Sequence, residues 1–109
     1  MAFGRTPQSV TDDLKKLIET LEAENQGQAQ VLVQALLSDL KELTTRRYNP
    51  TTRQTFYRAE RAGFDMNKAT NLRKALAQIA AEIQGGDLDL ALQDCQGALA
   101  LWAQSKGQT

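Results

Sequence analysis

The sequence predicts an all-α fold, an antiparallel helical bundle of four main helices plus one short helix. In four segments of the chain, apolar residues recur at spacings of three and four. Such spacings place the apolar side chains of a segment in one stripe along a helix. Fifteen leucines and fifteen alanines outnumber six valines and isoleucines, and leucine and alanine are the stronger helix formers. Short connections between the stripes favour antiparallel neighbours, as in a bundle.

The first two helices are predicted over about residues 8–25 and 28–46. Thr6 suits a helix cap and Pro7 the first helical position, where no amide hydrogen is needed. Arg46 and Arg47 are expected to end the second helix, where cations complement the carbonyl end of the helix dipole. The two stripes consist of Val10, Leu14, Leu17 and Leu21, and of Ala29, Val33, Leu36, Leu40 and Leu43.

A short third helix is predicted over residues 51–62. Pro50 disfavours helical geometry in the preceding residue, so the second helix must stop before it. Asn49 is expected to cap the new helix, with Pro50 at its first position, and Gly63 to end it. We find no sustained alternation of period two, so no strand is expected.

Asp65 and Asp87 are expected to cap the last two main helices. Together the helices are predicted to form a single domain over residues 1–109, with flexible ends at 1–7 and 105–109. The last two stripes consist of Ala69, Leu72, Leu76, Ile79 and Ile83, and of Leu88, Leu92, Cys95, Leu99 and Trp102.

One segment resembles two known helical families. Gly86-Asp87-Leu88 and the following helix, up to Ala98-Leu99, resemble the second helix of a tetratricopeptide repeat and the helical hairpin of the exonuclease VII small subunit. The preceding helix does not match the repeat, and no 34-residue recurrence is present. Gly-Asp between helices is also an ordinary stop-and-cap signal, so no functional residue is transferred.

The chain carries no formal net charge, but its charges are segregated. Residues 41–74 contain nine basic and three acidic side chains, whereas residues 1–40 and 75–109 are both acidic. Such a field can steer an anionic partner toward the basic middle. It can equally be neutralised by the acidic flanking helices or by a second copy of the chain.

No constellation of residues suits catalysis, a cofactor or a metal ion, so we expect a protein that is not an enzyme. The chain has no histidine, and its single cysteine, Cys95, falls on an apolar stripe as a buried core residue would. The acidic pairs Asp12/Asp13 and Asp87/Asp89 fall at helix starts, where capping explains them. Zinc would need histidine or clustered cysteine, and no glycine-rich phosphate loop is present.

A cytoplasmic location without a membrane partner is expected. One cysteine excludes an intrachain disulfide and fits a reducing compartment. No apolar run approaches the roughly 18 residues that would suggest a membrane span. The first ten residues also lack the apolar stretch of a secretory signal.

The candidate binding surface is the arginine- and tyrosine-rich segment 46–61. Residues 45–64 contain five arginines, no lysine and four aromatic side chains. On a helix, Arg53, Tyr57 and Arg61 would share a face, and Arg58 with Arg61 would form a second pair. Phe56 and Phe64 are expected to anchor the segment in the core. The candidate partner-binding residues are therefore Arg46, Arg47, Tyr48, Arg53, Tyr57, Arg58 and Arg61.

We interpret the chain as a small non-catalytic adaptor or regulatory protein that acts through protein–protein contact and self-associates, as in a homodimer. Arginine and tyrosine are enriched in the residues that dominate protein interfaces. The alternative is a nucleic-acid-binding module that uses the same segment on phosphates and bases, although zero net charge disfavours it. A third possibility is that the segment only pairs with the acidic flanks of its own chain.

Overall fold

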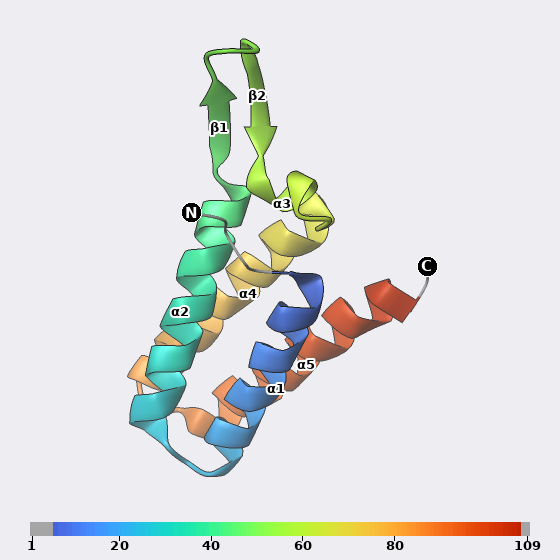
Figure 1. Cartoon of the computed structure of the whole chain (residues 1–109). Coiled ribbons are helices and arrows are strands. Elements are labelled where there is room, and N and C mark those ends of the chain that lie inside the picture. Colours follow the sequence, from blue (N-terminus) through green and yellow to red (C-terminus); the bar gives the residue numbers. More distant parts are fainter. Residues whose placement is uncertain (1–5, 108–109) are drawn as a thin grey trace.

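The apolar stripes form four long helices in the computed structural model, which describes residues 6–107 and their side chains except those of 61 and 104–107. The chain is predominantly helical, as predicted, but a two-stranded hairpin lies between the helices, where no strand was expected (Figure 1). The elements are α1 (Pro7–Glu22), α2 (Gln26–Thr44), β1 (Arg46–Asn49), β2 (Gln54–Tyr57), α3 (Arg58–Arg61), α4 (Met66–Gln84) and α5 (Leu88–Gly107).

The predicted caps at Thr6, Asp65 and Asp87 are confirmed. Thr6 Oγ1 accepts a hydrogen bond from the amide of Ser9 at 3.1 Å, and Ser9 Oγ accepts one from the amide of Thr6 at 2.9 Å. Asp65 Oδ1 accepts from the amides of Asn67 and Lys68 at 2.8 and 3.2 Å. Asp87 Oδ1 accepts from the amide of Leu90 at 3.2 Å. These bonds satisfy amides that have no partner within the helix.

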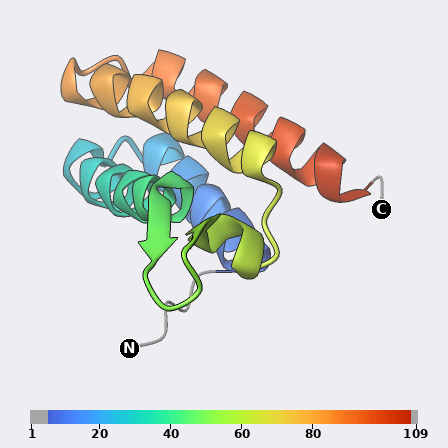
Figure 2. The ribbon, with the colours of Figure 1, turned by 90° about the horizontal axis from the view of Figure 1, so that it is seen from above.

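Two helix pairs pack on each other. Figure 2 shows α4 and α5 in one layer and α1 and α2 in another; α2 contacts α4, and α1 contacts α5. The α1–α2 turn and the α4–α5 turn lie at the same end of the molecule, opposite the hairpin (Figure 1). A hydrogen bond of 2.6 Å from Gln26 Nε2 to the carbonyl oxygen of Ile83 joins the two layers at that end.

The core is built from the predicted stripes of α1, α2 and α4. On α5 the buried residues are Ala91, Cys95, Ala98 and Trp102, whereas Leu88, Leu92 and Leu99 of the predicted stripe are only half-buried. Trp102 lies across the layers, where its indole nitrogen donates to Thr11 Oγ1 at 3.1 Å and its ring packs on Phe64 at a centroid distance of 6.0 Å. Phe64 is buried and anchors the core as predicted, whereas Phe56 is only half-buried. The largest fully buried side chains are Leu14, Leu17, Leu21, Leu36, Leu40, Leu43, Leu76, Ile79, Ile83, Val10, Val33 and Cys95.

The predicted flexible ends fall largely outside the described residues. Residues 1–5 and 108–109 are outside them, while Thr6 and Pro7 begin α1 and α5 extends through Gly107. In the part of the chain that the structure describes, every helix is too short or too polar to cross a membrane.

Candidate protein-binding surface at the hairpin

The segment predicted as a helix at 51–62 is a β-hairpin followed by the single turn α3. Asn49 Oδ1 accepts hydrogen bonds from the amides of Thr51 and Thr52 at 2.9 and 3.4 Å. The amide of Arg53 donates to the carbonyl oxygen of Asn49 at 2.7 Å and closes the loop. An asparagine followed by proline starts a turn with the same bonds that it would use to cap a helix, so the local signal serves both structures.

The second helix ends two residues earlier than predicted, so Arg46 and Arg47 belong to β1. The hydroxyls of Thr44 and Thr45 donate to the carbonyl oxygen of Lys41, and Thr45 has the extended ψ angle of 131°. Threonine side chains that bond to backbone carbonyls compete with continued helix formation. The chain therefore leaves α2 in an extended direction and enters the hairpin.

The strand register divides the hairpin into two faces. Arg46 pairs with Tyr57, and Tyr48 pairs with Thr55. Directly paired residues point to the same side of a sheet and successive residues alternate, so these four side chains form one face, which we call the outer face. The other face, called the inner face, consists of Arg47, Phe56, Asn49 and Gln54.

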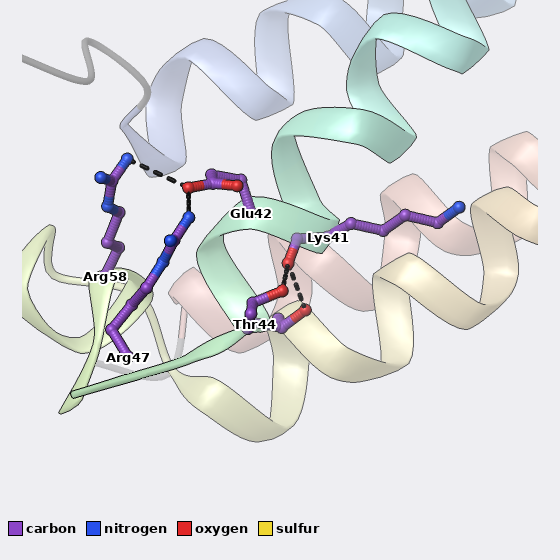
Figure 3. Close-up of polar contacts among 6 residues, drawn as sticks. Lys41, Glu42, Thr44, Arg47 and Arg58 are labelled. Atoms are coloured by element: carbon purple, nitrogen blue, oxygen red, sulfur yellow. Dashed lines mark hydrogen bonds and ion pairs between the residues drawn. The ribbon is translucent and has the colours of Figure 1, made fainter. Parts of the chain in front are cut away.

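Glu42 on α2 fixes the inner face to the helices. Its carboxylate oxygen Oε1 forms an ion pair with Arg47 of β1 and a second one, at 3.3 Å, with Arg58 of α3 (Figure 3). The Nε atom of Arg47 is buried and has no hydrogen-bond partner among the described residues. One acidic side chain therefore pairs with two of the predicted partner-binding arginines and leaves the cluster with one net positive charge. Sequence analysis did not identify this arrangement because it joins three separate elements.

The arginine side chains of the outer face and of the loop are not neutralised by any described residue. Arg46 and Tyr48 are exposed, with 60% of Tyr48 accessible, while Tyr57 is half-buried beside α3. Arg53 lies exposed in the loop with a φ of 59°, in the left-handed region. Neither Arg46 nor Arg53 makes an ion pair with any described side chain. Thr55 completes the outer face and was not among the predicted residues.

The predicted face formed by Arg53, Tyr57 and Arg61 does not exist. Arg53 belongs to the loop, Tyr57 to β2, and Arg61 to the end of α3, since the helix that would have aligned them is absent. Arg58 and Arg61 are the first and last residues of α3, and the side chain of Arg61 is outside the described set. The structure instead brings Arg46, Tyr48 and Tyr57 together and separates them from Arg47 and Arg58.

Two of the side chains weighed for catalysis and metal binding, Cys95 and Asp87, belong to α5 or to its start. Cys95 is fully buried, and desolvation raises the pKa of its thiol to about 12, which leaves it protonated at neutral pH. Asp87 accepts an amide hydrogen bond at the start of α5. Within residues 6–107, the described side chains contain no group of three or more acidic, cysteine or histidine residues that could hold a metal ion.

The α4–α5 end carries one buried carboxylate. Glu82 is 8% exposed; its Oε2 accepts from Gln78 at 3.1 Å, while its Oε1 has no partner among the described residues. Burial, together with the neighbouring Asp94 and Asp87, raises the pKa of this carboxyl above its ordinary value. This end of the molecule is therefore acidic and lacks a compensating cation among the described side chains.

Comparison with protein-family models, with curated proteins and with solved structures finds no significant match to this chain. The properties of the outer face of the hairpin are therefore inferred from its own residues, without a relative for comparison.

Proposed function

We propose that this protein is a small non-catalytic adaptor or regulatory protein that binds protein partners through the hairpin. The contact surface is the outer face, Arg46, Tyr48, Thr55 and Tyr57, together with Arg53 in the loop. The helices serve as an antiparallel bundle that presents this surface and holds its inner face. A cytoplasmic location belongs to the proposal, because the free buried thiol of Cys95 is compatible with a reducing compartment.

The observation that carries the proposal is the register of the two strands. It places two exposed residues of the types enriched in binding hot spots, Arg46 and Tyr48, side by side on a hairpin that projects beyond the helices (Figure 1). A large aromatic side chain that is 60% exposed gains most by burial against a partner. Two-stranded hairpins are marginal on their own, and Glu42 supplies the attachment that keeps this one in place.

Charge favours a protein partner over nucleic acid. Nucleic-acid affinity grows with the number of phosphates that basic side chains neutralise. On the hairpin and α3, Glu42 already pairs with Arg47 and Arg58, which leaves Arg46 and Arg53 as the described guanidinium groups open to a partner. Two contacts give a weak phosphate-binding site, whereas two arginines beside two tyrosines suffice for a protein hot spot.

The test places a photo-crosslinking amino acid at Thr55, in the middle of the outer face, and identifies what it captures in cells. We expect discrete protein adducts that disappear in the variant Arg46→Ala/Tyr48→Ala/Arg53→Ala, while the helical circular dichroism spectrum is retained. The matched control, Lys15→Ala/Lys16→Ala/Lys74→Ala, removes three cations from α1 and α4 and should retain the adducts.

Two results would contradict the proposal. Adducts that persist in the hairpin variant would show that the outer face is not the contact surface. Capture of nucleic acid in place of protein, with oligonucleotide binding that weakens steeply as salt rises, would establish the alternative function.

A further inference from the structure

Acidic and basic side chains gather at opposite ends of this elongated molecule. The principal extents are 48 × 29 × 21 Å, and the hairpin and the two helix–helix turns occupy opposite ends (Figure 1). Residues 17–34 and 75–94 contain seven acidic side chains and no lysine or arginine. Residues 41–68, which surround the hairpin, contain seven basic and three acidic side chains.

The acidic end is formed by the α1–α2 turn and the α4–α5 turn. Its exposed carboxylates are those of Glu22, Glu24, Asp87 and Asp89, and we call this set the acidic end. The hydrogen bond from Gln26 to Ile83 brings the two turns together. Beneath them lies Glu82, which is buried beside Asp87 and Asp94. No lysine or arginine in residues 17–34 and 75–94 compensates the exposed carboxylates, so this surface lacks a cationic counterpart within its own segments.

The outer face and loop supply cations of the right kind at the other end. Arg46 and Arg53 have no ion pair with described side chains, and each can grip a carboxylate in a bidentate manner. A symmetric contact between two hairpins would instead bring together the arginines of two copies of β1 and of the loop, and like charges in contact oppose association. The partner that complements the hairpin is therefore acidic, and the acidic end of a second copy has this character.

We propose that this protein associates with further copies of itself head to tail, with the outer face and loop of one hairpin docked on the acidic end of the next molecule. This inference rests on the proposed function, because it assigns a partner to the same surface. The two docking surfaces differ, so the contact is heterologous and leaves one hairpin and one acidic end open in every chain of copies. Zero net charge allows such copies to approach without overall repulsion.

Sedimentation of the purified full chain tests the proposal. In about 10 mM salt, where the Debye length is ~30 Å, we expect the average mass to rise with concentration above the 12.0 kDa of one chain. In about 1 M salt, where the Debye length is ~3 Å, the mass should return to that of the monomer.

Two neutralised variants then distinguish head-to-tail association from symmetric association. Arg46→Ala/Arg53→Ala disables the hairpin, and Glu22→Gln/Glu24→Gln/Asp89→Asn disables the acidic end while the cap at Asp87 is retained. Each variant alone should be monomeric. Their equimolar mixture should give dimers of two chains that grow no further, because only one pair of intact surfaces is present.

The control variant Lys16→Ala/Lys74→Ala removes two exposed cations from the helices and should associate as the unmodified chain does. Monomeric behaviour of the unmodified chain in low salt, or association of the hairpin variant alone, overturns head-to-tail association. If the chain is monomeric but the crosslinker at Thr55 still captures another protein, the proposed function stands and the second copy is excluded as its partner. If association persists in the hairpin variant and the crosslinked adducts persist as well, both proposals fail.

Discussion

Glu42→Gln tests directly how the hairpin is attached to the helices. The substitution keeps the shape of the side chain and removes the charge that pairs with Arg47 and Arg58. The Glu42 side chain is 37% exposed, so each pair falls in the range of about 0.2–1 kcal/mol measured for solvent-exposed pairs. The side chains of Arg47 and Arg58 are 38% and 44% exposed, so both pairs stay within this range. The two pairs together therefore stabilise the attachment by about 1 kcal/mol.

Amide hydrogen exchange is the appropriate measurement, because the loss is local. A two-stranded hairpin depends on its contacts for stability and opens independently of the core. A loss of about 1 kcal/mol corresponds to roughly fivefold faster exchange of the amides in β1 and β2. The amides of α1 and α4, which are protected by the buried core, should exchange at unchanged rates.

The matched control is Glu60→Gln. Glu60 lies on α3 at the same end of the molecule, is exposed, and makes no ion pair with the described side chains. The Glu60→Gln substitution removes the same charge without removing a described ion pair, so amide exchange in β1 and β2 should stay unchanged. Equal exchange rates in the Glu42 variant and the unmodified chain would show that Glu42 does not hold the inner face.

Three further predictions concern the core, the loop and the acidic end. Leu14→Ala should lower the free energy of unfolding by about 2–5 kcal/mol in urea denaturation, because Leu14 is fully buried; a loss below about 1 kcal/mol would show that its site is loosely packed. Arg53→Gly should slow hairpin exchange by relieving about 1 kcal/mol of left-handed strain, whereas Arg53→Ala, which keeps a Cβ, should not. The raised pKa of Glu82 means that the folded chain holds this proton more tightly than the unfolded chain, so its contribution to stability falls as pH rises through the unfolded value of about 4.3. Glu82→Gln should therefore raise the melting temperature at pH 7 and have little effect at about pH 3; a lower melting temperature at pH 7 would contradict this sign.

The long helices were predictable from the sequence because their signal is repeated. The stripes of α1, α2 and α4 each place four or five apolar side chains on one face, and all of these side chains are buried in the core. The caps at Thr6, Asp65 and Asp87 were predictable for a different reason, since a side-chain oxygen that accepts from nearby amides is a local interaction. The burial of Cys95 follows from its place on a stripe.

The hairpin could not be distinguished from a short helix by the same means. Four residues per strand give only two alternations, too few to establish a period of two. Asn49-Pro50 supports a helix start and a turn equally well, and what favours the turn is the strand tendency of the surrounding residues, Thr51, Thr52, Thr55, Phe56 and Tyr57. The role of Glu42 depends on contacts that exist only after the hairpin has folded back on α2.

The folded chain converts charge segregation along the sequence into charge segregation in space. Residues near the first turn and the last turn are far apart in the sequence, yet both turns come to the same end, and both are acidic (Figure 1). The basic middle of the chain is the connection between the two helix pairs, so it must lie at the other end. If the carboxylates of the two turns balanced the basic segment of their own chain, they would lie beside the hairpin arginines. Among the described side chains, only Glu42, which itself belongs to the basic segment, forms an ion pair with these arginines, and the proposed function therefore assigns Arg46 and Arg53 to a partner.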